Sequence, residues 1–435
     1  MKKIAFIGAG SLGFSRRLMI DILSFPALQD CMFSLMDIDE FRLGYVERIA
    51  KRIIDEGGYP AKFEVTTDRK KAIEGADYVI IMILANGFEA IKPEIEIPLK
   101  YGVDQCIGDT TGPGGIFRGL RTIPMILDIC RDVEKYAPNA FVLNYTNPMS
   151  ILCTAMNKAT SVRNVGLCHS VQGTAALIAN WVGIPYDEFD YLVAGINHQA
   201  WFLKAEHNGK SVYPTLREKI ADEEIYNSDT TRFEMFKHLD YFVTESSGHN
   251  SEYNPWFRKR PDLLQKYTPG GSWNGGTGFI LQLYGKDRED FAQDLERMAS
   301  GEDKINFNRS NEYGSQIINA METDAPFRFN GNVANNGFIS NLPTGSCVEV
   351  PCYADSHGLS PMVVGALPSQ LVILNQIHVA MADMTVEASL TGNKRLVFQA
   401  IAHDPLTSAV LSLQEIEDMV DELFASQSKW LPQFK

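Results

Sequence analysis

The chain has 435 residues, a formal net charge of −14 and seven scattered cysteines, so it can bury a core without disulfides, as expected of reduced thiols in a cytoplasmic protein. The acidic balance, with no run of Lys and Arg, argues against binding of a nucleic-acid backbone. The N-terminus does not resemble a signal peptide and no apolar run approaches about 20 residues, so we expect no membrane span.

Short apolar runs alternate with helix-length segments through the first part of the chain. Such runs, rich in β-branched and aromatic residues, indicate a parallel sheet that is covered by helices on both faces. We therefore expect an α/β fold with an N-terminal, doubly wound, Rossmann-like domain over residues 1–190. The expected strands are residues 4–7, 33–36, 63–65, 78–83, 140–143 and 164–167.

The pattern changes in the second part, where residues 191–435 are predicted to form an α+β domain that completes the functional site. Two polar, Gly-rich segments, Thr268–Thr277 and Phe329–Gly345, are predicted to be loops that could serve as lids or interface segments. The expected helices are residues 230–241, 308–323, 369–391 and 412–426, and the expected strands are 191–206, 327–333 and 347–354.

A glycine pattern follows the first expected strand and opens a helix, in the order Gly8-Ala9-Gly10-Ser11-Leu12-Gly13. Gly8 allows a tight turn, Gly10 the close approach of a pyrophosphate, and Gly13 the packing of helix on strand. The strand, the glycines and the helix together predict a dinucleotide site that includes Ser11 and Leu12.

Two further residues define this cofactor site. Asp37 ends the second expected strand, where a carboxylate can bind the adenosine ribose and would repel a 2′-phosphate, so we expect NAD rather than NADP. Asn86 follows the fourth strand and is expected beside the nicotinamide.

Cys168 and His169 lie at the carboxyl end of the sixth expected strand. Thiolate and imidazole are ligands that a borderline divalent metal prefers. Adjacent residues on an extended segment point in opposite directions, so only one of the two should reach a metal. His198, after the next strand-like run, offers a second imidazole. We predict that Cys168 and His198 bind one divalent metal.

Several polar residues are candidates for substrate binding. Asn147 follows the fifth strand and Asp109 opens a Gly-rich segment that we expect to be a loop. His249 and Tyr253 lie in residues 248–256, an expected loop whose His, Glu, Tyr and Trp are typical of a sugar-binding wall. Tyrosine acts as a base only when its pKa is lowered, which a nearby metal cation can do.

Taken together, these motifs resemble the NAD- and manganese-dependent glycosidases of glycoside hydrolase family 4, which do not use the two-carboxylate mechanism of most glycosidases. The resemblance covers essentially the whole chain. It rests on the N-terminal glycines, Gly112-Pro113-Gly114-Gly115, Asn144-Tyr145-Thr146-Asn147-Pro148, Gly166-Leu167-Cys168-His169-Ser170, Gly195-Ile196-Asn197-His198, Asn341-Leu342-Pro343 and Val348-Glu349-Val350.

The resemblance implies NAD and Mn²⁺, or another divalent metal, as cofactors of a redox-assisted elimination. It implies hydride transfer from C3 of the sugar, removal of the C2 proton by Tyr253, protonation of the glycosidic oxygen by His169, addition of water and return of the hydride. Asn147, Asp109 and His249 are expected to bind the substrate. The family likeness suggests a homodimer or homotetramer.

The expected substrate is a small terminal α-galactoside of the melibiose or raffinose type, because Cys168 to Thr174 and Tyr241 to Ser247 resemble the melibiase-type α-galactosidases of the family. An α-glucosidase or α-galacturonidase of the same family is the nearest alternative.

A NAD-dependent 2-hydroxy acid dehydrogenase is an alternative from another class, which would accumulate NADH and need no metal. The Cys168 and His198 pair argues against it, as does the lack of a recognisable His-Asp couple in the sequence. A third alternative is a catalytically silent NAD-sensing module, whose properties Cys168→Ser would leave unchanged.

Overall fold

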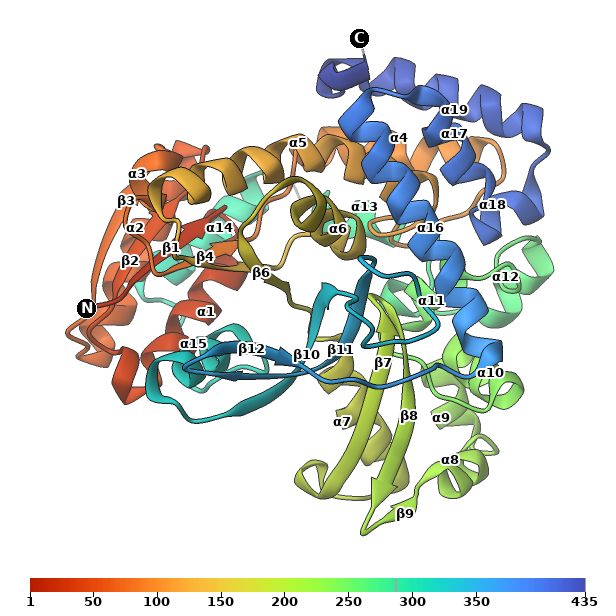
Figure 1. Cartoon of the computed structure of the whole chain (residues 1–435), viewed down its shortest axis with the longest axis horizontal. Helices are drawn as coiled ribbons and strands as arrows, with labels where there is room; N and C mark the ends of the chain where they lie inside the picture. Colours follow the sequence, from red (N-terminus) through yellow and green to blue (C-terminus); the bar gives the residue numbers. More distant parts are fainter. Residues whose placement is uncertain (286–287, 435) are drawn as a thin grey trace.

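The structure is a computed structural model that describes residues 1–285 and 288–434. The strands of this part form one mixed sheet in the order β3-β2-β1-β4-β5-β6-β10-β11-β7-β8-β9, with β12 beside β11. Helices lie on both sides of the N-terminal half of the sheet, and a group of C-terminal helices, blue in Figure 1, packs at one end of the molecule. Among the described residues, no helix is both long enough and apolar enough to cross a membrane.

The first six strands are parallel and follow the doubly wound order β3-β2-β1-β4-β5-β6, as the sequence predicts. The register pairs Ile7 with both Met36 and Ile81, so the carboxyl ends of the strands lie along one edge, where doubly wound sheets bind ligands. These strands are β1 (Lys3–Ile7), β2 (Met32–Met36), β3 (Lys62–Thr66), β4 (Tyr78–Ile81), β5 (Phe141–Asn144) and β6 (Arg163–Gly166).

Alternate residues of each strand pack into two separate cores. Ile4 and Phe6 belong to one core, whereas Ala5 and Ile7 belong to the other. The apolar runs are nearly continuous because both faces of the sheet are buried. The first core lies against α1 (Leu12–Leu23), α2 (Glu40–Gly57) and α15 (Gly314–Thr323), and the second against α3 (Arg69–Ile73), α5 (Gly112–Tyr136) and α6 (Met149–Ala159) (Figure 1).

The second part of the chain extends the same sheet with antiparallel strands. One row of paired residues runs through Gly166, Asn332, Glu349 and Gly195, so β6 ends at this row and β7 ends one residue past it. The segments that carry Cys168 and His198 therefore leave the sheet at the same level. The strands are β7 (Phe189–Ile196), β8 (Gln199–His207), β9 (Lys210–Ser211), β10 (Phe327–Ala334), β11 (Cys347–Asp355) and β12 (Gly358–Pro361).

Most of the remaining described chain is helical. Helix α16 (Ser369–Thr391) begins beside the β7–β8 hairpin and runs to the C-terminal helices (Figure 1). The other helices are α4 (Gly87–Lys100), α7 (Ser170–Val182), α8 (Tyr213–Lys219), α9 (Glu223–Ser228), α10 (Thr230–Leu239), α11 (Ser247–Tyr253), α12 (Pro261–Tyr267), α13 (Phe279–Tyr284), α14 (Arg288–Ser300), α17 (Lys394–Ala402), α18 (Pro405–Val410) and α19 (Leu413–Gln427), with short 3₁₀ turns that include η3 (Ser272–Asn274).

Several expected boundaries are wrong. The expected strand 191–206 is a hairpin, the expected helix 308–323 begins only at Gly314, and the segment that follows Asp109 becomes helical from Gly112. Residues 248–256 contain helix α11 and are not simply a loop. The first part of the expected loop Phe329–Gly345 belongs to β10, because its backbone pairs antiparallel with β11 as far as Ala334. The side chains of Asn330 and Asn332 add hydrogen bonds to carbonyls of β7 and β6.

Candidate functional site

The glycine pattern forms a tight turn between β1 and α1. Gly8 has a φ of +94°, and a Cβ there would lie 2.7 Å from the carbonyl oxygen of Met82. A Cβ on Gly10 would lie 2.6 Å from Oδ2 of Asp37, which accepts a hydrogen bond from the Gly10 N–H at 2.7 Å. Ser11 is exposed and makes no side-chain capping bond at the start of α1. The open helix N-terminus fits a pyrophosphate.

The role that the sequence predicts for Gly13 is wrong. A Cβ on Gly13 would meet no atom within 4 Å, so Gly13 is not required for packing of the helix on the strand. Leu12 faces the core instead, and is buried. Asn86 lies at the start of α4 with a φ of +60°, and its side-chain oxygen is 3.5 Å from the Arg121 guanidinium.

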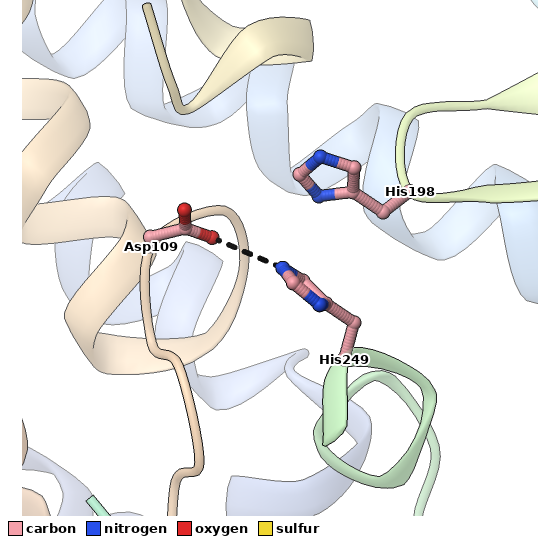
Figure 2. Close-up of side chains that lie close together, drawn as sticks. All are labelled: Asp109, His198 and His249. Carbon is pink, nitrogen blue, oxygen red and sulfur yellow. Dashed lines mark ion pairs between the residues drawn. The ribbon is translucent and has the colours of Figure 1, made fainter. Parts of the chain in front are cut away.

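Asp109, His198 and His249 converge in a buried cluster (Figure 2). Asp109 precedes α5, His198 lies in the β7–β8 turn, and His249 lies on α11. Each residue offers one ligand atom, and these atoms lie within 4.8 Å of one another. Asp109 and His249 form an ion pair at 3.6 Å, and the two imidazole rings lie 4.5 Å apart. The structure thus contains a His-Asp couple that the sequence analysis did not recognise.

The two histidines of the cluster differ in charge. Burial lowers the pKa of His249, but the Glu245 and Asp109 carboxylates raise it to about 9. Burial, reinforced by the charge of His249, lowers the pKa of His198 to about 4. Near neutral pH, His249 is therefore a cation without a free lone pair, whereas His198 is a neutral imidazole. This difference favours His198 as the metal ligand and His249 as the partner of Asp109.

Thr110 fixes the orientation of the His198 ring. Its hydroxyl donates to Oδ1 of Asp109 at 2.6 Å and lies 3.1 Å from Nδ1 of His198. A hydroxyl has one hydrogen to donate, so Nδ1 of His198 must carry the proton that Thr110 accepts. The lone pair of His198 is then on Nε2. Such a hydrogen bond is how proteins orient metal-binding histidines.

Asn147 joins the same cluster from the segment after β5. Its Nδ2 donates to Oδ2 of Asp109 at 3.1 Å. The side-chain oxygen of Asn147, Oδ1, is buried and has no hydrogen-bond partner among residues 1–285 and 288–434. Buried polar atoms are almost always paired, so this oxygen fits a ligand that donates a hydrogen bond, such as a sugar hydroxyl.

Cys168 is partly buried between β6 and α7 and is not a member of the Asp109–His198–His249 cluster. Burial and the Glu245 and Glu349 carboxylates raise the pKa of the Cys168 thiol. Glu245 also acts to raise the pKa of His198, although burial outweighs it. The Glu245 carboxylate thus acts on the pKa of both Cys168 and His198. The Cys168 thiol, unlike the neutral His198 ring, must lose a proton before it binds a metal.

His169 lies at the start of α7 with an exposed side chain. Its Nδ1 is 3.4 Å from a carboxylate oxygen of the buried Glu312. The hydrogen bond to Glu312 raises the pKa of His169. Because the ring retains a proton more readily than an ordinary histidine, it is suited to donate one.

Tyr253 is buried at the end of α11. Its hydroxyl oxygen accepts a hydrogen bond from the backbone N–H of His198 at 3.2 Å. Burial raises the pKa of Tyr253 well above its usual range. The hydroxyl is therefore beside a candidate metal ligand and needs an added positive charge before it can act as a base.

His378 on α16 is a site residue that the sequence analysis missed. Its Nε2 donates to the backbone carbonyl of Tyr253 at 3.0 Å, and its Nδ1 lies 3.0 Å from the hydroxyl of Thr111. Burial lowers the pKa of His378 to about 4, so the neutral ring accepts from Thr111 while it donates to Tyr253. A cavity of about 20 Å³ beside these residues is also lined by Asn197, whose buried amide has no partner within the described chain.

Glu245 is the second site residue that was missed. It has a φ of +76°, and its carboxylate lies 3.8 Å from the His249 ring, four residues later in the sequence. Burial alone would raise the pKa of Glu245, but the imidazoles of His249, His198 and His169 hold it below its usual range. Glu245 lies outside α11, before the N-cap Ser246, so the left-handed turn ahead of the helix brings it to His249 and no helical spacing in the sequence reveals it.

Sequence comparisons identify relatives along the whole chain. The chain is 41% identical to an α-galactosidase of Rhizobium meliloti over 99% of this chain and 89% of the relative. It is 40% identical to an α-galactosidase of Bacillus subtilis, over 100% of both chains.

Two solved structures share the fold. A putative glucosidase lplD of Bacillus subtilis superimposes with a TM-score of 0.88 at 29% identity, over 97% of this chain and 99% of that one. A 6-phospho-α-glucosidase from gut microorganisms, solved with NAD and Mn²⁺, has a TM-score of 0.84 at 21% identity and covers 100% of both chains.

Two family models match consecutive parts of the chain. The model of family 4 glycosyl hydrolases matches residues 3–184, and the model of their C-terminal domain matches residues 193–407. These matches agree with the doubly wound order of β1 to β6. The chain therefore belongs to family 4 of the glycosyl hydrolases.

Proposed function

We propose that this glycosidase is an α-galactosidase that hydrolyses small terminal α-galactosides of the melibiose or raffinose type. The observation that carries the proposal is the Tyr253 hydroxyl, held at 3.2 Å by the backbone of His198 beside the buried Asp109–His249 pair. Full-length identity of about 40% to two α-galactosidases supports the choice of sugar.

The residues present fit two cofactors. The turn that contains Gly8, Gly10, Ser11 and Leu12 fits the pyrophosphate of NAD, and Gly13 leaves open space beside it. Asp37, which accepts from the Gly10 N–H, is the proposed ribose ligand, and Asn86, at the start of α4, is proposed to lie beside the nicotinamide. Cys168 and His198 are the proposed ligands of Mn²⁺ or another divalent metal. When bound, NAD⁺ supplies a reversible hydride acceptor and the metal supplies Lewis-acid polarisation of sugar oxygens.

The side chains of this chain then divide the proton transfers between them. Tyr253 takes the proton from C2 of the galactosyl ring, since its hydroxyl lies beside His198. His169 gives a proton to the departing glycosidic oxygen, since the hydrogen bond to Glu312 raises the pKa of His169 and so favours its protonated form. Asn147, Asp109 and His249 bind sugar hydroxyls and hold the ring in place.

The charges of the site favour a neutral galactoside over a galacturonide. Two carboxylates, Asp109 and Glu245, already lie at 3.6 Å and 3.8 Å from His249, and Arg118 adds a second cation 3.8 Å from Asp109, so the charges are balanced. A uronate would bring a third carboxylate into this buried region, where an unpaired charge is costly. Membership of family 4 of the glycosyl hydrolases argues against the two alternatives, a hydroxy acid dehydrogenase and an NAD sensor.

Release of nitrophenol from nitrophenyl α-galactoside, α-glucoside and α-galacturonide tests the proposal. We expect cleavage of the galactoside in the presence of NAD⁺, Mn²⁺ and a reductant, with loss of activity when either cofactor is removed. Robust cleavage of another glycoside without cleavage of the galactoside would contradict the choice of sugar. NADH accumulation with a hydroxy acid would favour the dehydrogenase.

We also propose a cytoplasmic location and a homodimer or homotetramer. The seven free cysteines are consistent with a reducing compartment. Light scattering coupled to gel filtration measures the mass of the assembly, and a monomer would contradict this part of the proposal.

A further inference from the structure

Trp273 is an exposed aromatic residue beside the buried cluster. It lies in η3 and remains 43% exposed. Its ring is parallel to that of His249, with an interplanar angle of 4° and 6.0 Å between ring centroids. Phe279 contacts Trp273 edge-on, with centroids 5.2 Å apart. The indole is therefore held by two rings and still presents a large surface to solvent.

The Gly-rich segment around Trp273 is fixed in place. The Arg258 guanidinium donates to the backbone carbonyls of Asp104 and Gly275 at 3.0 Å and 2.8 Å. The Thr277 hydroxyl donates to the Asp104 carboxylate at 2.6 Å. The segment that the sequence suggested as a lid is thus bonded to the stretch of chain that leads into Asp109.

Helix α11 supports Trp273 from the other side. The Glu252 carboxylate accepts hydrogen bonds from the backbone N–H groups of Cys106, Ile107 and Gly108 at 2.8, 3.1 and 3.0 Å. A Cβ on Gly248 would lie only 2.6 Å from the carbonyl oxygen of Trp273, so the backbones of α11 and η3 are in close contact. Trp273 is therefore positioned by the same helix that carries His249 and Tyr253.

We propose that Trp273 is the aromatic wall of a subsite for the second sugar of the substrate, the hexose attached to the galactosyl unit. The inference rests on the proposed function and extends it to the leaving group. A pyranose presents one apolar face of C–H groups and a polar rim, which suits an exposed indole beside a few polar groups.

The order of the His198, His249 and Trp273 rings, from the buried cluster to solvent, assigns Trp273 to the second sugar, which is the leaving group. His198 and His249 are almost fully buried, whereas Trp273, stacked beyond His249, is the first of the three to reach solvent. A disaccharide that enters from solvent and places its terminal galactosyl ring at the buried cluster leaves its second sugar on the solvent side, where Trp273 lies. The cofactor turn, in contrast, lies at the end of β1.

Paired substrates separate the two sugar positions. Methyl α-galactoside and melibiose share the galactosyl unit, but only melibiose has a second pyranose ring. We expect Trp273→Ala to lower kcat/KM for melibiose about tenfold and for methyl α-galactoside less than about twofold. Trp273→Phe keeps an aromatic face and should restore part of the loss. Tyr186→Ala is the control, since Tyr186 is also an exposed aromatic residue, at 46%, and its hydroxyl lies 3.4 Å from that of Tyr191, at the end of α7 remote from His169.

Three results would overturn the inference. An equal loss on both substrates would place Trp273 against the galactosyl ring, and no loss on either would make it a packing residue. A weaker affinity of Trp273→Ala for NAD⁺, measured by calorimetry, would assign the indole to the cofactor. If the wild-type chain cleaves a different glycoside, the proposed function fails. The role of Trp273 is then still tested, by comparing the methyl glycoside and a disaccharide of the sugar that the chain does cleave.

Discussion

The hydroxyl oxygen of Tyr253 accepts a hydrogen bond of 3.2 Å from the backbone N–H of His198. This bond joins α11 to the β7–β8 turn and holds the proposed base against the backbone of the proposed metal ligand itself. The Tyr253 hydroxyl is therefore fixed by backbone geometry, while burial keeps it protonated until positive charge is added nearby.

Tyr253→Phe should lower kcat/KM by a factor of about 10² to 10⁴, as expected for loss of a general base. Binding of NAD⁺ should be unchanged. Tyr213→Phe is a matched control, because the Tyr213 hydroxyl also accepts a backbone hydrogen bond, from Phe242 at 3.1 Å. Steady-state kinetics of the two variants measure the difference. Comparable losses in both would indicate a structural effect rather than a base.

Metal affinity distinguishes the proposed ligands from the Asp109–His249 pair. Cys168→Ser and His198→Ala should each raise the dissociation constant for Mn²⁺ by about a hundredfold or more, whereas His249→Gln should raise it less than about tenfold. Electron paramagnetic resonance measures free Mn²⁺ without a need for turnover. If His249→Gln weakens binding as much as His198→Ala while Cys168→Ser has no effect, then the metal is held by the buried cluster instead.

His378 should act as a positioning residue for Tyr253. His378→Ala removes the donor to the Tyr253 carbonyl and the acceptor of the Thr111 hydroxyl, so we expect kcat to fall about tenfold with little change in KM. The kinetic isotope effect of substrate deuterated at C2 should increase, since proton abstraction becomes slower. His378→Gln should recover part of the rate. A rise in KM with unchanged kcat would point to substrate binding instead.

The buried Asp404 should make the free energy of unfolding depend on pH. Burial raises the pKa of Asp404 from 3.8 to about 6, despite hydrogen bonds from Thr407. Between about pH 4 and pH 6 the folded chain retains a proton that the unfolded chain has released, so stability falls as pH rises through this window. The loss is about 3 kcal/mol.

Thermal melting at pH 5 and pH 8 measures this effect. The wild-type chain should lose a few degrees of Tm at pH 8 that Asp404→Asn does not lose, since the amide oxygen can still accept from Thr407. Asp222→Asn removes the same charge from an exposed helix cap and serves as the control. Equal pH dependence in wild type and Asp404→Asn would contradict the assignment.

The sequence predicts the N-terminal sheet and the cofactor turn because their signals are local. Apolar runs mark each buried strand, and the run from Gly8 to Gly10 specifies the turn. The motif also predicts a packing role for Gly13, which is wrong, since a Cβ there would meet no atom of the described residues within 4 Å. The position of Cys168 at the carboxyl edge of the sheet is also predictable, because Cys168 comes directly after β6.

The rest of the site depends on contacts between distant segments. Helix α11 is polar throughout and yet buried, so it has no apolar period to reveal it as a helix. His378 lies within an ordinary helical stretch, and only the packing of α16 brings it to Tyr253. The Asp109–His249 ion pair likewise forms through tertiary structure alone.

The central claim is that hydrolysis proceeds through loss and return of the proton at C2, with Tyr253 as the base. Melibiose hydrolysed in D₂O by the enzyme with NAD⁺ and Mn²⁺ should release galactose that carries deuterium at C2, as detected by NMR and mass spectrometry. Tyr253→Phe should abolish this incorporation along with turnover. Galactose released at the normal rate with only hydrogen at C2 would contradict the account, because direct displacement at C1 leaves the C2 proton in place.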